Sequence, residues 1–464
     1  MTSSPRIPLP GRRPLVVGAA RSGLAAARLL RRSGFDVELC DRAEPAAPVR
    51  AELSSLGIET RFGRDDAALL EGRDFVVWSP GIPIDHPIVT AARAASLAVL
   101  SELEIGFRYA RAPLLCVTGT NGKSTTTDLT GALLRGAGRE AAVCGNIGRA
   151  ICDVVEGVSE AGVLVVEVSS FQLETVERLK PFVATWLNLT PDHLDRHRTL
   201  EAYAALKQRL FALQSTSDYA VRNADDPGVM AQRAGAATAL EFSREREVAA
   251  GANVVASGIE LAWRGARETL MPAAEVSLRG PHNLSNALAA LATVLPFELP
   301  RAALRETLRG YRGLEHRLEP VATVEGIEFV NDSKATNLDS LTVALQSFRE
   351  PVVLIAGGRD KGQDFGTALE LARRKVRHAV LIGEGADRIA AAWRGVPVTR
   401  AATLAEAVDR AFEAARDAAG GSEPRGTVLL SPGCASFDMF RDFEDRGARF
   451  KAEVERLRLK EART

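Results

Sequence analysis

The sequence predicts an α/β protein made of three α/β domains, and three observations support this fold class. Short apolar segments typical of buried strands alternate with Ala-, Leu- and Arg-rich segments typical of helices. A strand that leads through a nucleotide-type turn into a helix recurs along the chain. The chain has 464 residues, which corresponds to about three domains at roughly 150 residues each.

We place the domains at residues 1–112, 113–316 and 317–464. The first and third are expected to be Rossmann-like, and the middle one to be a P-loop-type ATPase domain. Segment 254–278 is rich in strand-forming residues and predicts an antiparallel side sheet on the middle domain. The predicted buried strands are 15–18, 75–78, 114–118, 163–168, 352–356, 379–382 and 428–430.

Composition and charge exclude several classes of protein. With 59 basic and 59 acidic residues the net charge is zero, which argues against nucleic-acid binding by bulk charge. No apolar run approaches the roughly 18 residues of a membrane span, and the N-terminus has no apolar signal-peptide segment. The five cysteines form no CxxC pair, which is typical of reduced thiols. We therefore expect a cytoplasmic protein. We also expect a monomer.

The first candidate phosphate loop follows segment 15–17 and extends from Gly18 to Gly23. A turn between a strand and a helix places anionic groups at the helix N-terminus. The dinucleotide motif G-x-G-x-x-G requires glycine where Ala20 stands. This disfavours NAD and leaves open either another diphosphate or a plain tight turn.

Two later strand ends belong to the same predicted site. The next strand ends at Asp41 and Arg42, where a Rossmann fold usually places residues that contact a sugar or base. Ser79 and Gly81 flank a proline in a further turn at a strand end. Ligands of open α/β sheets bind beside such turns.

The second candidate phosphate loop follows segment 114–117. Its residues are Gly119, Thr120, Asn121, Gly122, Lys123, Ser124 and Thr125. Glycines let backbone N–H groups turn towards phosphate oxygens. Lys123 can lie along the β- and γ-phosphates as a point charge. Ser124 or Thr125 can offer a hydroxyl to Mg²⁺. Val117 stands where the full Walker motif has its first glycine. The order of strand, loop and helix still matches that of a P-loop, which favours ATP binding over a structural turn.

Further polar residues lie at strand ends and helix starts. Glu167 ends an apolar segment, where an unpaired carboxylate is costly unless it binds a metal or a partner. His193 lies in a polar cluster, and local sequence leaves open a metal ligand or a structural histidine. Lys207, read alone, is an ordinary surface lysine on a helix. Asn283 and Asn286 begin a helix, where capping is the simpler interpretation and nucleotide contact the alternative.

Taken together, these motifs resemble the Mur ligase family over nearly the whole chain. The segments that carry the resemblance are 119–125, 145–148, 167–174, 192–196 and 282–283. Segments 331–337 and 431–438 resemble the D-glutamate-adding members. The resemblance implies three α/β domains that bind a UDP-sugar, ATP and the incoming amino acid, in that order.

The resemblance also implies roles for single residues. ATP would be bound by the loop 119–125 with Asn283, Asn286, Arg317 and Asp332. The UDP-substrate would be bound by Gly18, Ser22, Gly23, Asp41, Arg42, Ser79, Gly81 and Asn146. D-glutamate would be bound by Lys334, Thr336, Lys361, Ser436, Phe437 and Phe443. Magnesium would be bound by Ser124, Glu167, His193 and Lys207 as a carbamate, with Lys123, Glu167, His193 and Lys207 as the catalytic set. Where the family often has an Asp-Thr-Arg-like triplet, this chain has Cys40, Asp41 and Arg42. The position of the residue that would contact uracil is therefore open by one place in the sequence.

The activity implied is that of an ATP-dependent acid–D-amino-acid ligase of peptidoglycan precursor and cell-wall synthesis. The carboxylate of UDP-N-acetylmuramoyl-L-alanine would take the γ-phosphate of ATP, and D-glutamate would attack the acyl phosphate. Another Mur-type ligase and folylpolyglutamate synthase are rivals, although the latter should lack the unit 15–42. A non-catalytic nucleotide sensor is disfavoured by Lys123, Glu167, His193 and Lys207, and an NAD oxidoreductase by Ala20.

Overall fold

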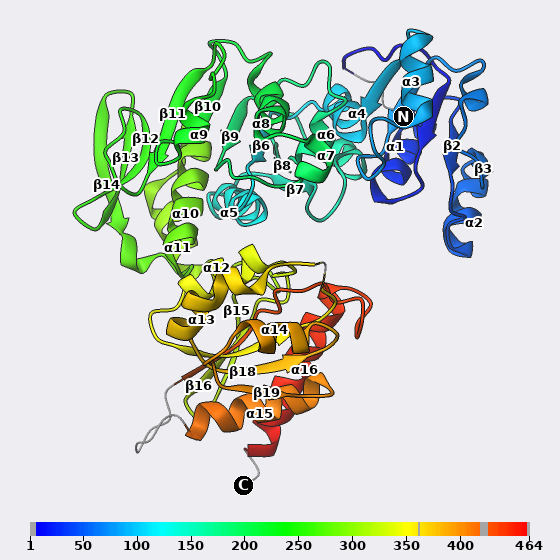
Figure 1. Cartoon of the computed structure of the whole chain (residues 1–464). Helices are drawn as coiled ribbons and strands as arrows, with labels where there is room; N and C mark the ends of the chain where they lie inside the picture. The colour runs from blue at the N-terminus through cyan, green and yellow to red at the C-terminus, as the bar shows by residue number, and fades with distance from the viewer. Residues whose placement is uncertain (1–5, 361, 418–425, 462–464) are drawn as a thin grey trace. The chain divides into compact units, whose positions relative to one another are not determined.

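The computed structural model describes residues 6–360, 362–417 and 426–461 (Figure 1). It contains three sheets, of five, nine and six strands. Met1–Val276 and Ser285–Gly310 form one compact unit with the first two sheets, and Ser277–Leu284 and Tyr311–Thr464 form a second unit with the third sheet. The predicted class, three α/β domains, is confirmed. No described helix is long and apolar enough to cross a bilayer.

The first sheet is wholly parallel, with strand order β3-β2-β1-β4-β5. This is the Rossmann order, and it reverses between β1 and β4, where ligands of such sheets bind. The elements are β1 (Pro14–Val17), α1 (Arg21–Arg32), β2 (Glu38–Asp41), α2 (Ala47–Ser55), β3 (Glu59–Phe62), β4 (Phe75–Trp78), α3 (Pro87–Ala94), β5 (Ala98–Ser101) and α4 (Glu102–Tyr109).

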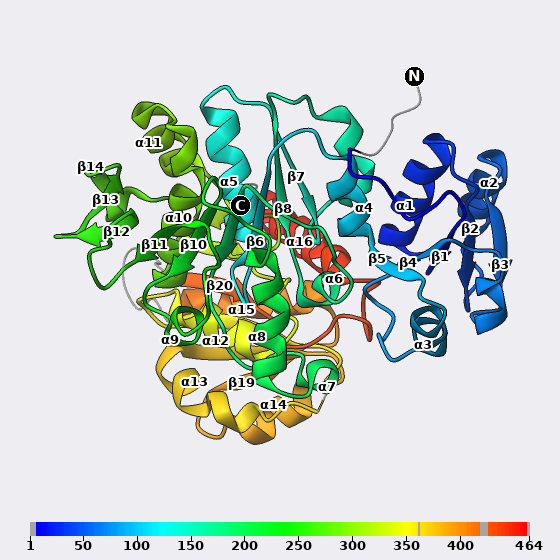
Figure 2. The same ribbon diagram turned by 90° about the horizontal axis from the view of Figure 1, so that it is seen from above.

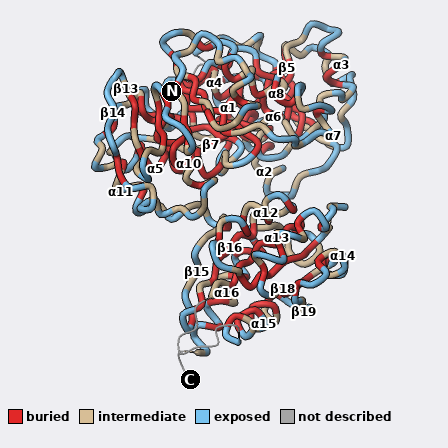
Figure 3. Tube along the Cα trace, turned by 60° about the vertical axis from the view of Figure 1, so that its left-hand side comes forward, coloured by how far each residue is buried: buried red, intermediate tan, exposed pale blue. Residues whose placement is uncertain are grey.

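Helices cover both faces of this sheet, because side chains along a strand alternate between faces. Val16 packs into the core that contains the leucines of α1, whereas Leu15 and Val17 pack with Ile88 of α3. Figure 2 shows α1 and α3 on opposite sides of the strands. In Figure 3 the buried residues follow the strands and the exposed residues follow the outer turns. Burial on both faces explains why β1 and β4 have continuous apolar sequences.

The second sheet has the order β14-β13-β12-β11-β10-β9-β6-β8-β7. Its elements include β6 (Leu114–Thr118), α5 (Lys123–Gly136), β7 (Ala141–Gly145), β8 (Val163–Glu167), α6 (Ser170–Leu173), β9 (Val183–Trp186), α7 (Leu194–His197), α8 (Leu200–Gln208), β10 (Tyr219–Asn223), β11 (Thr238–Ser243), β12 (Gly251–Val255), β13 (Gly258–Trp263), β14 (Ala266–Pro272), α10 (Pro281–Val294) and α11 (Arg301–Gly310). Strands β12 to β14 are antiparallel as predicted.

These antiparallel strands do not form a separate side sheet, which is a correction to the prediction. They extend the main sheet, because β12 pairs in parallel with β11. Gly251 permits this pairing: its φ is 135°, and a Cβ there would collide with the carbonyl oxygen of Glu241.

The third sheet has the order β15-β16-β20-β17-β18-β19 and is parallel except for the hairpin of β15 and β16. Its elements are β15 (Glu319–Val324), β16 (Ile327–Asn331), α12 (Leu338–Gln346), β17 (Val352–Gly357), α13 (Leu369–Lys375), β18 (Val376–Ile382), α14 (Ala386–Ala392), β19 (Val398–Arg400), α15 (Leu404–Asp417), β20 (Gly426–Leu430) and α16 (Phe443–Glu461). Leu354 packs with α12 and α14 on one face, and Val353 and Ile355 pack with α15 and α16 on the other.

Helix α4 begins with a buried carboxyl group. Glu102 is 2% exposed, and its Oε1 accepts a hydrogen bond of 2.7 Å from the backbone N–H of Cys152. Its Oε2 has no hydrogen-bond partner among the residues that the structure describes. Burial raises the pKa of Glu102 from 4.5 to about 7, although the Cys152 N–H bond opposes this shift.

We expect Glu102→Gln to stabilise the protein above pH 7 and to leave its stability unchanged at low pH. The folded state holds the Glu102 proton up to about pH 7, whereas the unfolded chain releases it near pH 4.5. The stability contributed by the protonated form is therefore complete below pH 4.5 and is lost as the pH rises through 7. The glutamine variant does not lose it, with an upper limit of roughly 3 kcal/mol. Thermal unfolding midpoints from pH 5 to 9 measure the difference.

The exposed Glu71 provides a control for this prediction. Glu71→Gln should keep a constant difference from the wild type across the same pH range. A difference between Glu102→Gln and the wild type that does not widen between pH 5 and 7 would show that Glu102 ionises normally in the folded protein.

Candidate functional site

The first phosphate loop lies at the point where the order of the first sheet reverses. Gly18 has a φ of 104°, and a Cβ there would lie 2.5 Å from Oγ of Ser79 in the turn after β4. A Cβ on Gly23 would collide with the carbonyl oxygen of Gly18. Gly18 therefore allows a close approach of the β1 and β4 turns, and Gly23 allows α1 to begin close to the β1 turn. Ser22 is half-buried in the first turn of α1, and Gly81 is exposed.

Asp41 and Arg42, the two candidates for the uracil contact, have different environments. The Asp41 carboxylate accepts hydrogen bonds from the N–H groups of Ala19 (2.6 Å) and Ala43 (2.8 Å), so it fixes the phosphate loop. The Arg42 side chain is 75% exposed and pairs with Asp65 at 2.5 Å. Arg42 is the more accessible of the two.

The first phosphate loop is joined to a loop of the second sheet. The Arg21 guanidinium donates hydrogen bonds to the carbonyl oxygens of Gly148 (2.6 Å) and Asn146 (3.0 Å). The side-chain amide of Asn146 donates in turn to Oε1 of Glu167 (2.7 Å). Asn146, predicted to contact the UDP-substrate, thus also orients the predicted metal ligand Glu167.

The second phosphate loop connects β6 to α5. Gly122 has a φ of 81°, and a Cβ there would collide with the side-chain oxygen of Asn286. Nζ of Lys123 donates hydrogen bonds to the carbonyl oxygens of Gly119 (3.0 Å) and Thr120 (2.7 Å). The structure therefore brings Asn286 and Lys123 to this loop. Ser124 and Thr125 begin α5 and are 9% and 8% exposed.

Asn188 organises this loop, although it was not among the predicted site residues. Its side-chain oxygen accepts hydrogen bonds from the N–H groups of Thr120 (2.9 Å) and Asn121 (2.8 Å), and its amide donates to the Asn121 carbonyl (3.0 Å). It lies two residues after β9, next to β6 in the sheet. Its position at a strand end was the available sequence signal.

Glu167 has the environment of a metal ligand. It ends β8 and is 2% exposed. Its Oε1 is bonded to Asn146, and its Oε2 is buried with no hydrogen-bond partner in the described part of the chain. A buried carboxylate oxygen without a donor is costly and suits a cation. The described residues contain no group of three or more His, Cys, Asp or Glu able to hold a metal ion.

His193 lies at the N-cap of α7 with a φ of 53°, a conformation that non-glycine residues seldom adopt. Its side chain is 46% exposed, and its ring centroid lies 4.8 Å from that of Phe171. An accessible imidazole in a strained turn is typical of a ligand-binding residue.

Lys207 is not a surface lysine, and the interpretation from local sequence was wrong. It is 1% exposed, and its Nζ donates hydrogen bonds to the Gly119 carbonyl (2.9 Å) and to Oγ1 of Thr118 (3.4 Å). It belongs to the face of α8 that also buries Tyr203, at spacing i, i+4. Burial lowers the pKa of Lys207 well below 10.5, and the nearby charge of Lys123 adds to this effect.

Tyr203 is a second neighbour of the loop that sequence reasoning missed. Its hydroxyl donates to Oγ1 of Thr120 at 3.5 Å, and Nζ of Lys207 lies 4.3 Å from its ring centroid. Its spacing from Lys207 on α8 was a signal that both face the core.

In the second compact unit, Asp332 is fixed by protein contacts. One carboxylate oxygen accepts a hydrogen bond from the Ser431 hydroxyl (2.8 Å), and the other accepts from the Leu318 N–H (3.2 Å). Burial raises the pKa of Asp332 from 3.8 to about 7, while these bonds and the charge of Arg317 oppose the shift. Asn283, also in this unit, donates its side-chain amide to the Arg279 carbonyl (2.8 Å) on the preceding turn.

The predicted D-glutamate residues fall mainly on two neighbouring loops of this unit. Nζ of Lys334 lies 3.6 Å from the ring centroid of Phe443, a cation–π geometry. Ser436 is 2% exposed and Phe437 is 60% exposed, whereas Thr336 is half-buried. Lys361 lies outside the described residues.

Arg446 holds these two loops together and was not predicted. Its side chain is fully buried and donates hydrogen bonds to Oγ (3.0 Å) and the carbonyl (2.9 Å) of Ser333 and to the Cys434 carbonyl (3.2 Å). It therefore stabilises the loops that carry Lys334 and Ser436.

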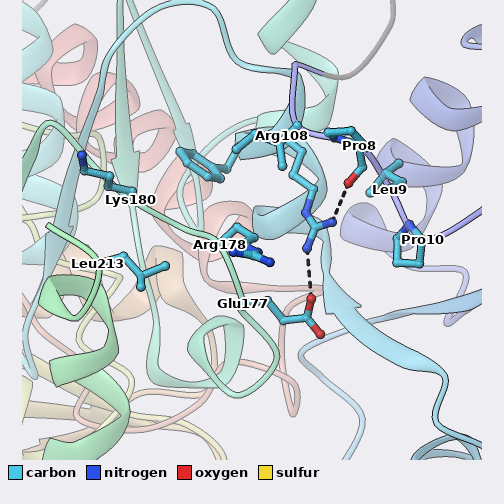
Figure 4. Close-up of a pocket in the computed structure, with 10 residues that line it drawn as sticks. Pro8, Leu9, Pro10, Arg108, Glu177, Arg178, Lys180 and Leu213 are labelled. Atoms are coloured by element: carbon cyan, nitrogen blue, oxygen red, sulfur yellow. Dashed lines mark hydrogen bonds and ion pairs between the residues drawn. The ribbon is translucent and has the colours of Figure 1, made fainter.

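A cavity of about 640 Å³ lies elsewhere in the first unit, beside the segment 7–10. Figure 4 shows its Arg108, whose guanidinium donates to the Pro8 carbonyl (2.9 Å) and to Glu177 (3.1 Å). None of the predicted site residues lines this cavity. Its buried arginine is held in structural contacts, so we do not assign the site there.

Comparison with known proteins gives a consistent result along the chain. Residues 12–101 match the Mur ligase MurD-like N-terminal domain, residues 117–294 the Mur ligase middle domain, and residues 316–434 the Mur ligase glutamate ligase domain. A UDP-N-acetylmuramoylalanine–D-glutamate ligase of Pelotomaculum thermopropionicum is 43% identical over 95% of this chain and 96% of that protein. One of Myxococcus xanthus is 44% identical over 97% and 99%.

The fold also matches solved structures. The UDP-N-acetylmuramoylalanyl-D-glutamyl-2,6-diaminopimelate–D-alanyl-D-alanyl ligase of Acinetobacter baumannii superposes with a TM-score of 0.60 at 15% identity. The match covers 95% of this chain and 93% of that one. At this identity the likeness concerns the fold alone.

Proposed function

Because the chain belongs to the Mur ligase family, we propose that it is the ATP-dependent ligase that joins D-glutamate to UDP-N-acetylmuramoyl-L-alanine in peptidoglycan precursor synthesis. The observation that carries this proposal is the identity of 43% and 44%, over nearly the whole chain, to two ligases of that name. The match of residues 12–101 to the MurD-like N-terminal domain disfavours a family member that lacks a UDP-sugar domain.

The reaction has two steps. The substrate carboxylate attacks the γ-phosphorus of ATP, which releases ADP and forms an acyl phosphate. The amine of D-glutamate then attacks the acyl carbon, and an amide forms as phosphate leaves. In the first step Lys123 neutralises charge on the transferred phosphoryl group. Its present contacts with two loop carbonyls support this role, because they place the ammonium at the loop.

Magnesium fits the chain's own residues. The unpartnered, buried Oε2 of Glu167 is a suitable oxygen ligand, and Ser124 and His193 would add a hydroxyl and an imidazole. When bound, the ion supplies charge neutralisation at the phosphates. We further propose that Lys207 serves as a carbamate. Its buried, depressed-pKa amine favours the neutral form that reacts with CO₂.

The remaining assignments are proposed in the same way. The UDP-substrate lies along Gly18, Ser22, Gly23, Asp41, Arg42, Ser79, Gly81 and Asn146. The nucleotide lies along the loop 119–125 with Asn283, Asn286, Arg317 and Asp332. D-glutamate binds to Lys334, Thr336, Lys361, Ser436, Phe437 and Phe443. We propose domain boundaries after residues 112 and 316, a cytoplasmic location and a monomeric state.

The test of this function is an amino-acid panel in a phosphate-release assay with ATP and UDP-N-acetylmuramoyl-L-alanine. We expect D-glutamate to give turnover at least about a hundredfold above L-alanine, L-glutamate or a diamino acid. L-alanine and a diamino acid would leave charged groups of the site without their partners, and L-glutamate would point its charged groups in the wrong directions. Omitting either the UDP-substrate or the amino acid should abolish sustained phosphate release. Equal or faster turnover with L-alanine or a diamino acid would assign the chain to another branch of the family.

A further inference from the structure

The turn that carries His193 is strained at both ends of α7. His193 has a φ of 53°, and Arg198 has a φ of 69°. The N–H of Thr199 bonds to the His197 carbonyl at 2.9 Å, which closes a tight γ-turn around Arg198. Non-glycine residues persist in such conformations when surrounding contacts fix them. Arg196, in this turn, donates three side-chain hydrogen bonds.

Arg196 fixes the turn to α6. Its Nε and Nη2 donate to the two oxygens of Glu174, at 2.9 Å and 2.5 Å, and the two side chains are 14% and 6% exposed. Its guanidinium carbon lies 4.5 Å from the ring centroid of Phe171. The rings of His193 and His197 also pack on Phe171, with centroid distances of 4.8 Å and 5.4 Å. Arg196 therefore holds the ring on which the His193 imidazole packs.

Arg196 also reaches the first sheet's domain. Its Nη2 donates a hydrogen bond of 2.9 Å to the carbonyl oxygen of Ile82. Ile82 closes the turn after β4, which contains Ser79 and Gly81, and its carbonyl also accepts from Nε1 of Trp78 (3.1 Å). One guanidinium thus connects the turn proposed to bind the UDP-sugar with the turn of His193.

We infer that Arg196 is a positioning residue, which keeps the Ser79–Gly81 turn and the His193 turn at the separation that the reaction requires. The inference rests on the proposed function, in which one substrate molecule is held at the first turn and reacts beside the second. A reacting carboxylate must lie about 3–3.5 Å from the atom it attacks, and a displacement of about 1 Å can cost a hundredfold in rate. Lysine cannot replace the forked contacts of the guanidinium.

The experiment compares Arg196→Lys and Arg196→Gln with the wild type in the full chain. For each protein, kcat and the KM values of ATP, UDP-N-acetylmuramoyl-L-alanine and D-glutamate are measured, together with the thermal unfolding midpoint. We expect kcat to fall about 30- to 100-fold in both variants, because the substrate carboxylate is misplaced. The KM of ATP should stay within about twofold. Among the described residues the Arg196 side chain bonds to Glu174 and Ile82, and neither belongs to the loop 119–125. A purely structural role would not separate kcat from the KM of ATP in this way.

Arg28 provides a matched control. It also donates two hydrogen bonds to one carboxylate, that of Glu52, at 2.7 Å and 2.9 Å, and its side chain is 25% exposed. Arg28→Gln should keep the wild-type kinetic constants. A second variant, Glu174→Gln, preserves side-chain size and should shift kcat in the same direction as Arg196→Gln, by a smaller factor. If the Arg196 variants do not fold, Glu174→Gln decides the question.

The outcomes separate the two proposals. A wild-type protein that forms no product with D-glutamate would overturn the proposed function. A wild-type protein that is active, with Arg196 and Glu174 variants that match its kcat, would overturn the positioning role alone. A drop in kcat shared by Arg28→Gln would also overturn it, because the effect would then follow from loss of any arginine–glutamate pair with two hydrogen bonds.

Discussion

Lys123→Ala should reduce turnover by about two orders of magnitude or more, even at saturating ATP, because it removes a charge partner of the transferred phosphoryl group. The ammonium is held over the loop by hydrogen bonds to the Gly119 and Thr120 carbonyls. The side chain is half-buried rather than fully solvent-facing, yet it occupies no core position, so the fold should persist. Phosphate release at saturating ATP and the thermal unfolding midpoint are the two measurements.

Lys180 is the matched control for this substitution. It too holds two partners, Ser215 at 3.0 Å and Asp218 at 3.1 Å, and belongs to neither phosphate loop. Lys180→Ala should keep wild-type turnover. Near-wild-type turnover in Lys123→Ala at saturating ATP would remove this lysine from the proposed mechanism.

Lys207→Ala should reduce turnover by about two to three orders of magnitude. A small carboxylic acid such as acetate should restore part of the activity. The alanine variant leaves a buried space beside Gly119 and Thr118, in which a carboxylate can replace the anionic group of a carbamate. Turnover is measured with and without acetate, at constant ionic strength. Thermal unfolding at the same time shows whether the loss of two buried hydrogen bonds has destabilised the variant.

Lys207→Met provides the matched control, because methionine fills the space without a charge. It should be as inactive as the alanine variant and should not respond to acetate. Full activity in Lys207→Ala, together with electron density for a bare ammonium at Lys207 in a magnesium–nucleotide complex, would refute the carbamate. The two lysine substitutions are not independent, because the Lys123 charge helps to lower the pKa of Lys207; their effects should not add.

The strands predicted from sequence are those with both faces covered. β1, β4, β6 and β8 are buried along their whole length, so each is a continuous apolar segment. β3 (Glu59–Phe62) alternates between exposed and half-buried residues and has no such signature. The hairpin of β15 and β16 was likewise missed, because much of β15 is partly exposed.

In the candidate site, glycines and ligand-type residues were visible in the sequence, whereas the contacts that orient them were not. The motif of Lys123 is contiguous, so its loop could be predicted. Asn188 bonds to residues 68 and 67 positions earlier, and Arg446 to a residue 113 positions earlier. No local pattern encodes these contacts. The burial of Lys207 depends on which face of α8 is turned towards β6. This is a tertiary property, and its signal in the sequence was the spacing of Lys207 from Tyr203.

The cysteines of this protein have a practical consequence for spectroscopy. All five are buried, and burial raises the pKa of Cys434 to about 11, that of Cys40 to about 12, and those of the others further. Maleimide reagents attack the thiolate, which is scarce at such sites near neutral pH. New cysteines at exposed positions, such as Glu71→Cys and Glu413→Cys, should therefore be labelled selectively without removal of the native thiols. A dye pair on the two compact units would then measure the distance between the two labels by energy transfer during turnover.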